Sequence, residues 1–188
     1  MSTPVQSANI AVAQARKGYE DALPETISAF QKTLSAAFDQ LITITVKQQT
    51  KITKEMDPAE RGVLKFNVTQ AIQSGAQAVE PRIRALELDD LARARKDSSS
   101  RISAISPDKI LSPLLDVAVQ LLRDAGYDTS SIAAGNSLRA LDLDYSADHA
   151  SRRLDAYIDA YYLAVAALAA VVRRTEENEA AALWDDAG

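Results

Sequence analysis

The stretch "LDAYIDAYYLAVAALAAVV" (Leu154–Val172) carries the clearest structural pattern in the sequence. Its apolar residues recur at alternating spacings of four and three: Leu154, Ile158, Tyr161, Val165, Leu168 and Val172. A repeat of about 3.5 residues is typical of a helix in a bundle or coiled coil. A second apolar stripe lies beside the first, which indicates that neighbours surround the helix. We therefore expect a long core helix over 147–182.

The same stretch raises the question of a membrane anchor, because Ala160–Val172 is a run of 13 residues without a charge. A helix needs roughly 20 apolar residues to span a bilayer. Asp159 closes the run on one side and Arg173 on the other. The sequence therefore predicts no membrane span and a helix covered by protein.

Working outward, prolines mark the starts of further helices, and capping residues precede most of them. Thr3-Pro4 predicts a first helix to about Ala22, and Leu23-Pro24 predicts a second that continues to about Glu55. Asp57-Pro58, with Glu60 completing a capping box, predicts a third helix to about Val79. Pro81 either kinks that helix or begins a fourth.

The second half of the chain has similar signals. Ser106-Pro107 predicts a helix that ends at Ala125-Gly126, with glycine just beyond the last turn. Only "LITITV" (Leu41–Val46) alternates like a strand, and no second convincing strand exists to pair with it. We expect helix there, and an all-α fold: a multi-helix bundle of mostly antiparallel long helices.

The Ser-rich "KDSSSR" (Lys96–Arg101) is the most linker-like stretch. It predicts an N-terminal lobe over 1–96, a joint over 97–101 and a C-terminal lobe over 102–188. The two lobes can share a core, and a single compact domain is the alternative.

Composition removes several chemistries. The chain has no cysteine, so disulfides, thiolate metal sites and cysteine nucleophiles are absent. A net charge of −5 argues against non-specific nucleic-acid binding. The N-terminal sequence lacks the pattern of a secretory signal, so we expect a soluble cytoplasmic protein.

No motif predicts a catalytic residue, a metal or a cofactor. His149 is the only histidine, and no glutamate precedes it by three residues as helical di-iron sites require. Asp142–Asp148 resembles the start of a calcium loop, but Ala147 and Arg153 occupy the positions that need glycine and glutamate.

Three surfaces remain as candidate binding sites. A small-molecule or metal-diphosphate site would use carboxylates and tyrosines of the last helix: Asp155, Tyr157, Asp159 and Tyr162. A phosphate or nucleic-acid surface would use basic residues at the end of the N-terminal lobe and in the joint: Arg82, Arg93, Lys96 and Arg101. Intrahelical ion pairs such as Asp89 with Arg93 also explain this charge pattern. The acidic-aromatic tail either folds back to cap the bundle or docks into a partner: Leu183, Trp184, Asp185 and Asp186.

The function that fits these observations is a non-enzymatic helical interaction module: an adaptor, an assembly subunit or an inhibitor. Its partner would be another protein or a second copy of itself, bound through apolar helical faces. The competing hypotheses are an enzyme or small-molecule binder using the face of Asp155, Tyr157 and Asp159, and nucleic-acid binding through Arg82–Arg101.

Overall fold

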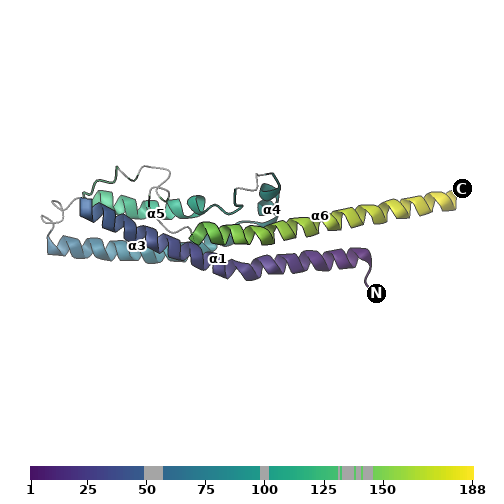
Figure 1. The fold of residues 1–188 in the computed structure, drawn as a ribbon, viewed down its shortest axis with the longest axis horizontal. Coiled ribbons are helices and arrows are strands. Elements are labelled where there is room, and N and C mark those ends of the chain that lie inside the picture. The colour runs from purple at the N-terminus through teal and green to yellow at the C-terminus, as the bar shows by residue number, and fades with distance from the viewer. Residues whose placement is uncertain (49–56, 98–101, 131, 133–137, 139–140, 142–145) are drawn as a thin grey trace. The chain divides into compact units, whose positions relative to one another are not determined.

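The computed structural model describes residues 1–48, 57–97, 102–130, 132, 138, 141 and 146–188. These residues form five helices and no strand (Figure 1), so the predicted all-α class is confirmed. The helices are α1 (Pro4–Gln48), α3 (Pro58–Arg84), α4 (Leu88–Asp97), α5 (Pro107–Asp124) and α6 (Ser146–Ala187).

The chain divides into two compact units, each assembled from separate stretches of sequence. Unit 1 contains Met1–Pro24, Leu88–Ala104 and Arg152–Gly188, and unit 2 contains Glu25–Glu87 and Ile105–Ser151. These units do not follow the expected lobes, 1–96 and 102–188. The long helices α1 and α6 each contribute to both units, which a division at a single linker does not anticipate.

Helix α1 is one continuous helix, whereas the sequence predicted a break at Leu23-Pro24. A proline inside a helix costs about 3 kcal/mol, because it removes a hydrogen bond and crowds the preceding turn. Apolar residues on both sides of Pro24 are nevertheless buried: Tyr19, Leu23, Ile27, Phe30 and Leu34. Each fully buried apolar side chain contributes about 1.5–3 kcal/mol, so burial outweighs the cost of the proline.

The strand-like segment Leu41–Val46 is helical, as predicted. Leu41 is fully buried, and the hydroxyls of Thr43 and Thr45 donate to carbonyls four residues earlier, at 2.8 and 2.7 Å. Hydrogen bonds to the backbone thus accommodate the two threonines within the helix, and Thr45 is also buried. The predicted continuation to Ile52 and Glu55 lies outside the described residues.

Helix α3 begins at Pro58 as predicted, but the capping box does not form. Asp57 makes no side-chain capping bond, and its backbone carbonyl accepts the first bond of the helix from Arg61 N at 3.0 Å. The helix also continues through Pro81 to Arg84, so this proline does not begin a new helix.

Helix α5 ends as its sequence predicts. Gly126 has a φ of +93°, a conformation that glycine adopts without a steric penalty. The amide of Gly126 donates to Arg123 O, and that of Tyr127 donates to Leu122 O, each at 3.0 Å. This pair of bonds is the Schellman motif, and it satisfies carbonyls of the last turn.

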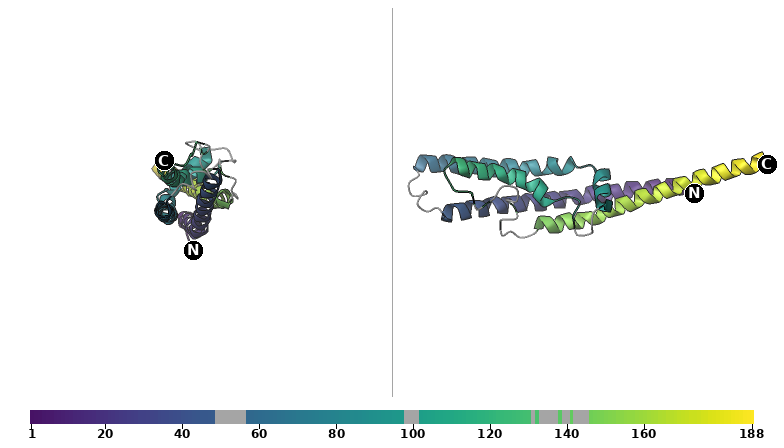
Figure 2. Two further views of the ribbon diagram at one scale, coloured as in Figure 1. Left: turned by 90° about the vertical axis from the view of Figure 1, so that its left-hand side faces the viewer. Right: turned by 90° about the horizontal axis from the view of Figure 1, so that it is seen from above.

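The core of unit 2 forms where α1, α3 and α5 pack together. Helices α3 and α5 contact each other and lie side by side (Figures 1 and 2). Fully buried side chains come from all three helices: Phe30, Leu34, Phe38 and Leu41 from α1, Val79 and Ile83 from α3, and Leu111, Leu115 and Leu122 from α5. Gly75 allows the close approach of α3 to α1, because a Cβ there would lie 3.2 Å from a Leu34 methyl group.

Helix α6 begins at Ser146 and ends at Ala187, close to the predicted 147–182, but it is not a core helix along its length. Leu154, Ile158 and Tyr161 are buried as predicted. Beyond Tyr161 no residue of α6 is buried, and Val165 is 37% exposed. The apolar pattern predicted neighbours on all sides, and the structure places protein against only one side of this stretch.

Within the described residues, α6 is the one helix long and apolar enough to cross a membrane by length and composition. Only 17% of its most apolar window is buried, which distinguishes it from the core helix of a soluble protein. A single helix of this kind is weak evidence for a membrane span.

Candidate interaction surface

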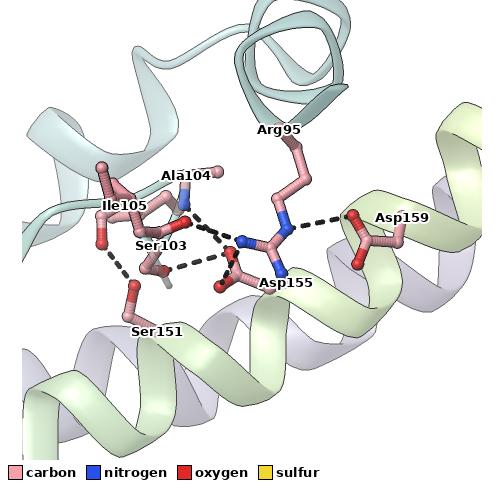
Figure 3. A network of polar contacts seen from close by, with 8 residues as sticks. Arg95, Ser103, Ala104, Ile105, Ser151, Asp155 and Asp159 are labelled. Atoms are coloured by element: carbon pink, nitrogen blue, oxygen red, sulfur yellow. Dashed lines mark hydrogen bonds and ion pairs between the residues drawn. The ribbon is translucent and has the colours of Figure 1, made fainter. Parts of the chain in front are cut away.

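A buried cluster of charged and polar groups fixes α6 within unit 1, and Arg95 of α4 lies at its centre (Figure 3). The Arg95 guanidinium lies 3.6 Å from Asp155 Oδ2 and donates to Asp159 Oδ1 at 3.1 Å. Its side chain is 15% exposed and that of Asp155 is 6% exposed. Because Asp155 and Asp159 are one helical turn apart, a single planar guanidinium can contact both carboxylates.

The same cluster attaches the chain that follows α4. Arg95 donates to Ile102 O at 2.7 Å, and Asp155 Oδ1 accepts from Ser103 Oγ at 3.1 Å and from Ala104 N at 3.0 Å. In unit 2, Ser151 donates through Oγ to Ile105 O. The Asp155 carboxylate is therefore paired with a cation and with two further donors, as a buried charge requires.

A second polar contact in unit 1 involves Tyr161. Its hydroxyl donates to Asp89 Oδ1 at 2.5 Å and accepts from Arg16 at 2.9 Å, and the Arg16 guanidinium lies 5.1 Å from the ring centre. Burial and the hydrogen bond to Asp89 raise the pKa of Tyr161, and Arg16 opposes this shift. The tyrosine is thus held neutral at the edge of the apolar contact.

The four residues predicted as a ligand site do not gather at one place. Asp155 and Asp159 contact Arg95, and Tyr162 lies on their side of α6, with Lys96 of α4 at 6.0 Å from its ring centre. Tyr157 lies against α1, where a Cβ on Gly18 would be 3.4 Å from its ring. The carboxylates that the hypothesis assigned to a ligand are therefore engaged by protein groups.

The predicted basic surface is divided between the two units. Arg82 is an exposed residue of α3, whereas Arg93 and Lys96 belong to α4, and Arg101 lies outside the described residues. Arg93 forms its ion pair with Asp90 at 2.7 Å rather than with Asp89. Asp89 is instead directed to Tyr161.

The tail residues continue α6 instead of folding back onto the bundle. Leu183 is 72% exposed and Trp184 is 80% exposed, and Asp185 and Asp186 belong to the same helical end. In Figures 1 and 2 this end extends beyond the N-terminus of α1. The interpretation of the tryptophan as a cap of the bundle is therefore wrong.

One face of α6 in unit 1 combines charged ends with an apolar centre, and we call it the α6 stripe. At about 100° per residue its members project from one side of the helix. They are Arg152, Ala156, Asp159, Leu163, Ala166, Ala167, Ala170, Arg174, Glu177 and Ala181. All are exposed except Asp159, which is half-buried against Arg95, and Leu163 at the centre is 65% exposed.

Sequence reasoning identified Asp155 and Asp159 but did not predict that Arg95, Asp89 and Arg16 hold α6 in place. It assigned Asp89 to an ion pair with Arg93 and considered Arg95 only as a contributor to a phosphate-binding surface. The only signal for these residues was that each is a charge on or beside an apolar helical face. Among the described residues, no group of three or more His, Cys, Asp or Glu side chains could hold a metal ion, and His149 is exposed.

Comparison with known proteins adds no assignment: no protein-family model, curated protein or solved structure matches this chain.

Proposed function

We propose that this protein is a helical interaction module that binds another protein chain through the α6 stripe. The observation that carries the proposal is the exposure of Leu163, at 65%, within a 13-residue helical segment that has no charge on any side. Contiguous apolar surface of this kind on a folded protein marks a binding surface.

The rigidity of the surface supports the proposal. The Arg95 cluster and the contact between Tyr161 and Asp89 fix the buried side of α6 on the turns just before Leu163. A helix held in this way presents its outer face with little conformational freedom left to lose. Partners therefore bind it at a lower entropic cost than they would a mobile segment.

The enzymatic hypothesis has less support. Asp155 is buried and contacts Arg95, Ser103 and Ala104, and Tyr157 lies on another side of α6. A carboxylate engaged in this way must lose those contacts before it can bind a metal-diphosphate. The nucleic-acid hypothesis is weakened by the pairing of Arg93 with Asp90.

A membrane is the other environment that could cover α6. Although α6 as a whole is long enough, its uncharged segment Ala160–Val172 is about 20 Å long at about 1.5 Å per residue, so a span of the about 30 Å hydrocarbon core would have to include the flanking charges of Asp159 or Arg173. The alanines that line the stripe allow close contact between helices. We therefore favour a protein partner.

Site-specific photocrosslinking tests the proposal. A benzophenone amino acid at Leu163 should form adducts with protein in cells of the native host, whereas the same group at Glu176 should not. Glu176 is exposed on a different side of the same helix and serves as the matched control. Equal protein adducts at both positions, or none at Leu163, would contradict a protein-binding role for the stripe.

A further inference from the structure

We infer that the partner of the α6 stripe is a second copy of this chain, bound antiparallel so that two α6 helices pair along their stripes. The inference rests on the proposed function and adds the identity and direction of the partner. It follows from the order of charges along the stripe.

The charges lie symmetrically, with opposite signs, around an uncharged centre. Before the centre the stripe carries Arg152 and then Asp159, and after it come Arg174 and then Glu177. When two copies run in opposite directions, the charges before the centre of one copy are opposite in sign to the charges that they meet after the centre of the other. Among the described residues, Arg152, Arg174 and Glu177 form no ion pair, so their charges are available to a partner.

Reversing one copy about a midpoint between Leu163 and Ala167 brings these charges together. Arg152 of each copy then lies within one turn of Glu177 of the other, and Asp159 lies within one turn of Arg174. Twofold symmetry repeats each contact, which gives two attractive pairs between Arg152 and Glu177 and two weaker ones between Arg174 and Asp159, whose carboxylate already accepts from Arg95. A parallel, in-register pair would instead place every charge beside its like.

The centre of the same arrangement is apolar and sterically open. Leu163 of each copy faces the region of Ala166 and Ala167 of the other, so a large side chain meets small ones. Small residues at a helix contact allow the backbones to approach closely, at about 8 Å. The stripe from Arg152 to Ala181 is about 45 Å long, which provides an extended contact.

The direction of pairing can be tested by disulfide trapping, because the chain contains no native cysteine. Ala160→Cys and Ala170→Cys change exposed positions, one beside the stripe and one within it, that lie at the same level of the antiparallel pair, and they leave all charges intact. Mixing the two single variants under oxidising conditions should give the mixed disulfide. Each variant alone should not crosslink, because its two copies lie about 15 Å apart along the helix. Crosslinking of each variant with itself, but not in the mixture, would overturn the antiparallel arrangement.

The charge pattern is tested by sedimentation equilibrium. Glu177→Arg should weaken dimerisation by roughly tenfold or more, because twofold symmetry creates two repulsive pairs. Arg152→Glu combined with Glu177→Arg should restore it. Glu176→Arg is the matched control, because it changes the net charge equally on another side of the helix. Equal weakening by Glu177→Arg and Glu176→Arg, or no rescue by the double variant, would overturn the inference.

A strict monomer at about 100 μM, a hundredfold above a micromolar dissociation constant, would overturn self-pairing. Protein adducts from Leu163 would still support the proposed function in that case, with a different protein as partner. Co-flotation of the monomer with anionic vesicles, lost in Leu163→Glu, would identify a lipid surface instead and overturn both statements.

Discussion

At the scale of single residues, the fold of unit 1 depends on charged groups that compensate one another inside the protein. Arg95 joins two carboxylates of α6 to the chain that follows α4, and it is 15% exposed. Breaking a buried pair leaves the remaining charge without compensation, which is costly. A pair at the surface contributes little. Asp155 and Asp159 allow both cases to be compared around one arginine.

Asp155→Ala should therefore lower the free energy of unfolding by about 3 kcal/mol. Asp159→Ala, which removes a carboxylate that is 46% exposed, should cost less than about 1 kcal/mol. Both variants gain the same helix-favouring alanine, so the comparison isolates the effect of burial. Urea unfolding followed by circular dichroism measures the difference, and equal losses would contradict the buried pairing.

Tyr161 predicts a dependence of stability on high pH. Its pKa is raised in the folded protein above the ordinary value of about 10. Between the two pKa values the folded state retains a proton that the unfolded state has lost. The contribution of Tyr161 is thus fully present below about pH 10 and is lost as the pH rises through the folded pKa.

Tyr161→Phe should flatten the decline of stability above about pH 10 and cost about 1–2 kcal/mol at neutral pH, since it removes a buried hydroxyl with two partners. Tyr162→Phe is the matched control, because Tyr162 is half-buried beside Lys96. Thermal melts at several pH values measure both effects. Identical pH profiles for the wild type and Tyr161→Phe would show that Tyr161 does not cause the decline of stability at high pH.

At the scale of helices, most of the architecture could be predicted from the sequence. The start of α5 at Pro107 and its end at Gly126 follow from local chemistry, and the structure confirms both. The continuity of α1 through Pro24 could not be predicted, because it depends on the burial of residues on both sides of the proline. The pairing of Arg95 with Asp155 joins residues 60 positions apart, and no local spacing reveals such a contact.

The packing of α3 against α1 makes a further prediction. At Gly75 a single added carbon would already lie 3.2 Å from Leu34, so Gly75→Val should cost about 1–3 kcal/mol by overpacking. At Gly62, in the same helix, an added carbon would meet nothing within 4 Å. Gly62→Ala should stabilise the protein by up to about 1 kcal/mol through its higher helix propensity. Chemical denaturation distinguishes the two, and stabilisation by Gly75→Val would contradict the close contact.

At the scale of the whole molecule, the main departure from the sequence-based expectation is the bare outer side of α6. The apolar repeat of Leu154–Val172 predicted a helix surrounded by neighbours, and one chain supplies neighbours on one side only. Periodicity records that a face is apolar. It does not record whether the covering surface comes from the same chain. The prediction of burial therefore failed beyond Tyr161, where no residue of α6 is buried.

Leu163→Glu separates folding from association. Because Leu163 is 65% exposed, the variant should retain its helicity and unfold within about 0.5 kcal/mol of the wild type at low protein concentration. At high concentration the wild type alone should gain stability, because association stabilises the folded state by mass action. Melting curves over a hundredfold range of concentration measure this, and parallel shifts in both proteins would contradict a role for Leu163.

The interleaving of the two units also has a consequence for biosynthesis. Unit 2 is complete once the ribosome has added Ser151, whereas unit 1 combines residues 1–24 and 88–104 with residues 152–188, which are synthesised later. The N-terminal turns of α1 therefore remain without their contacts to α6 until residues 152–188 have been synthesised. During that interval their apolar side is accessible to chaperones, and native unit 1 forms after the last residue of unit 2 has been added.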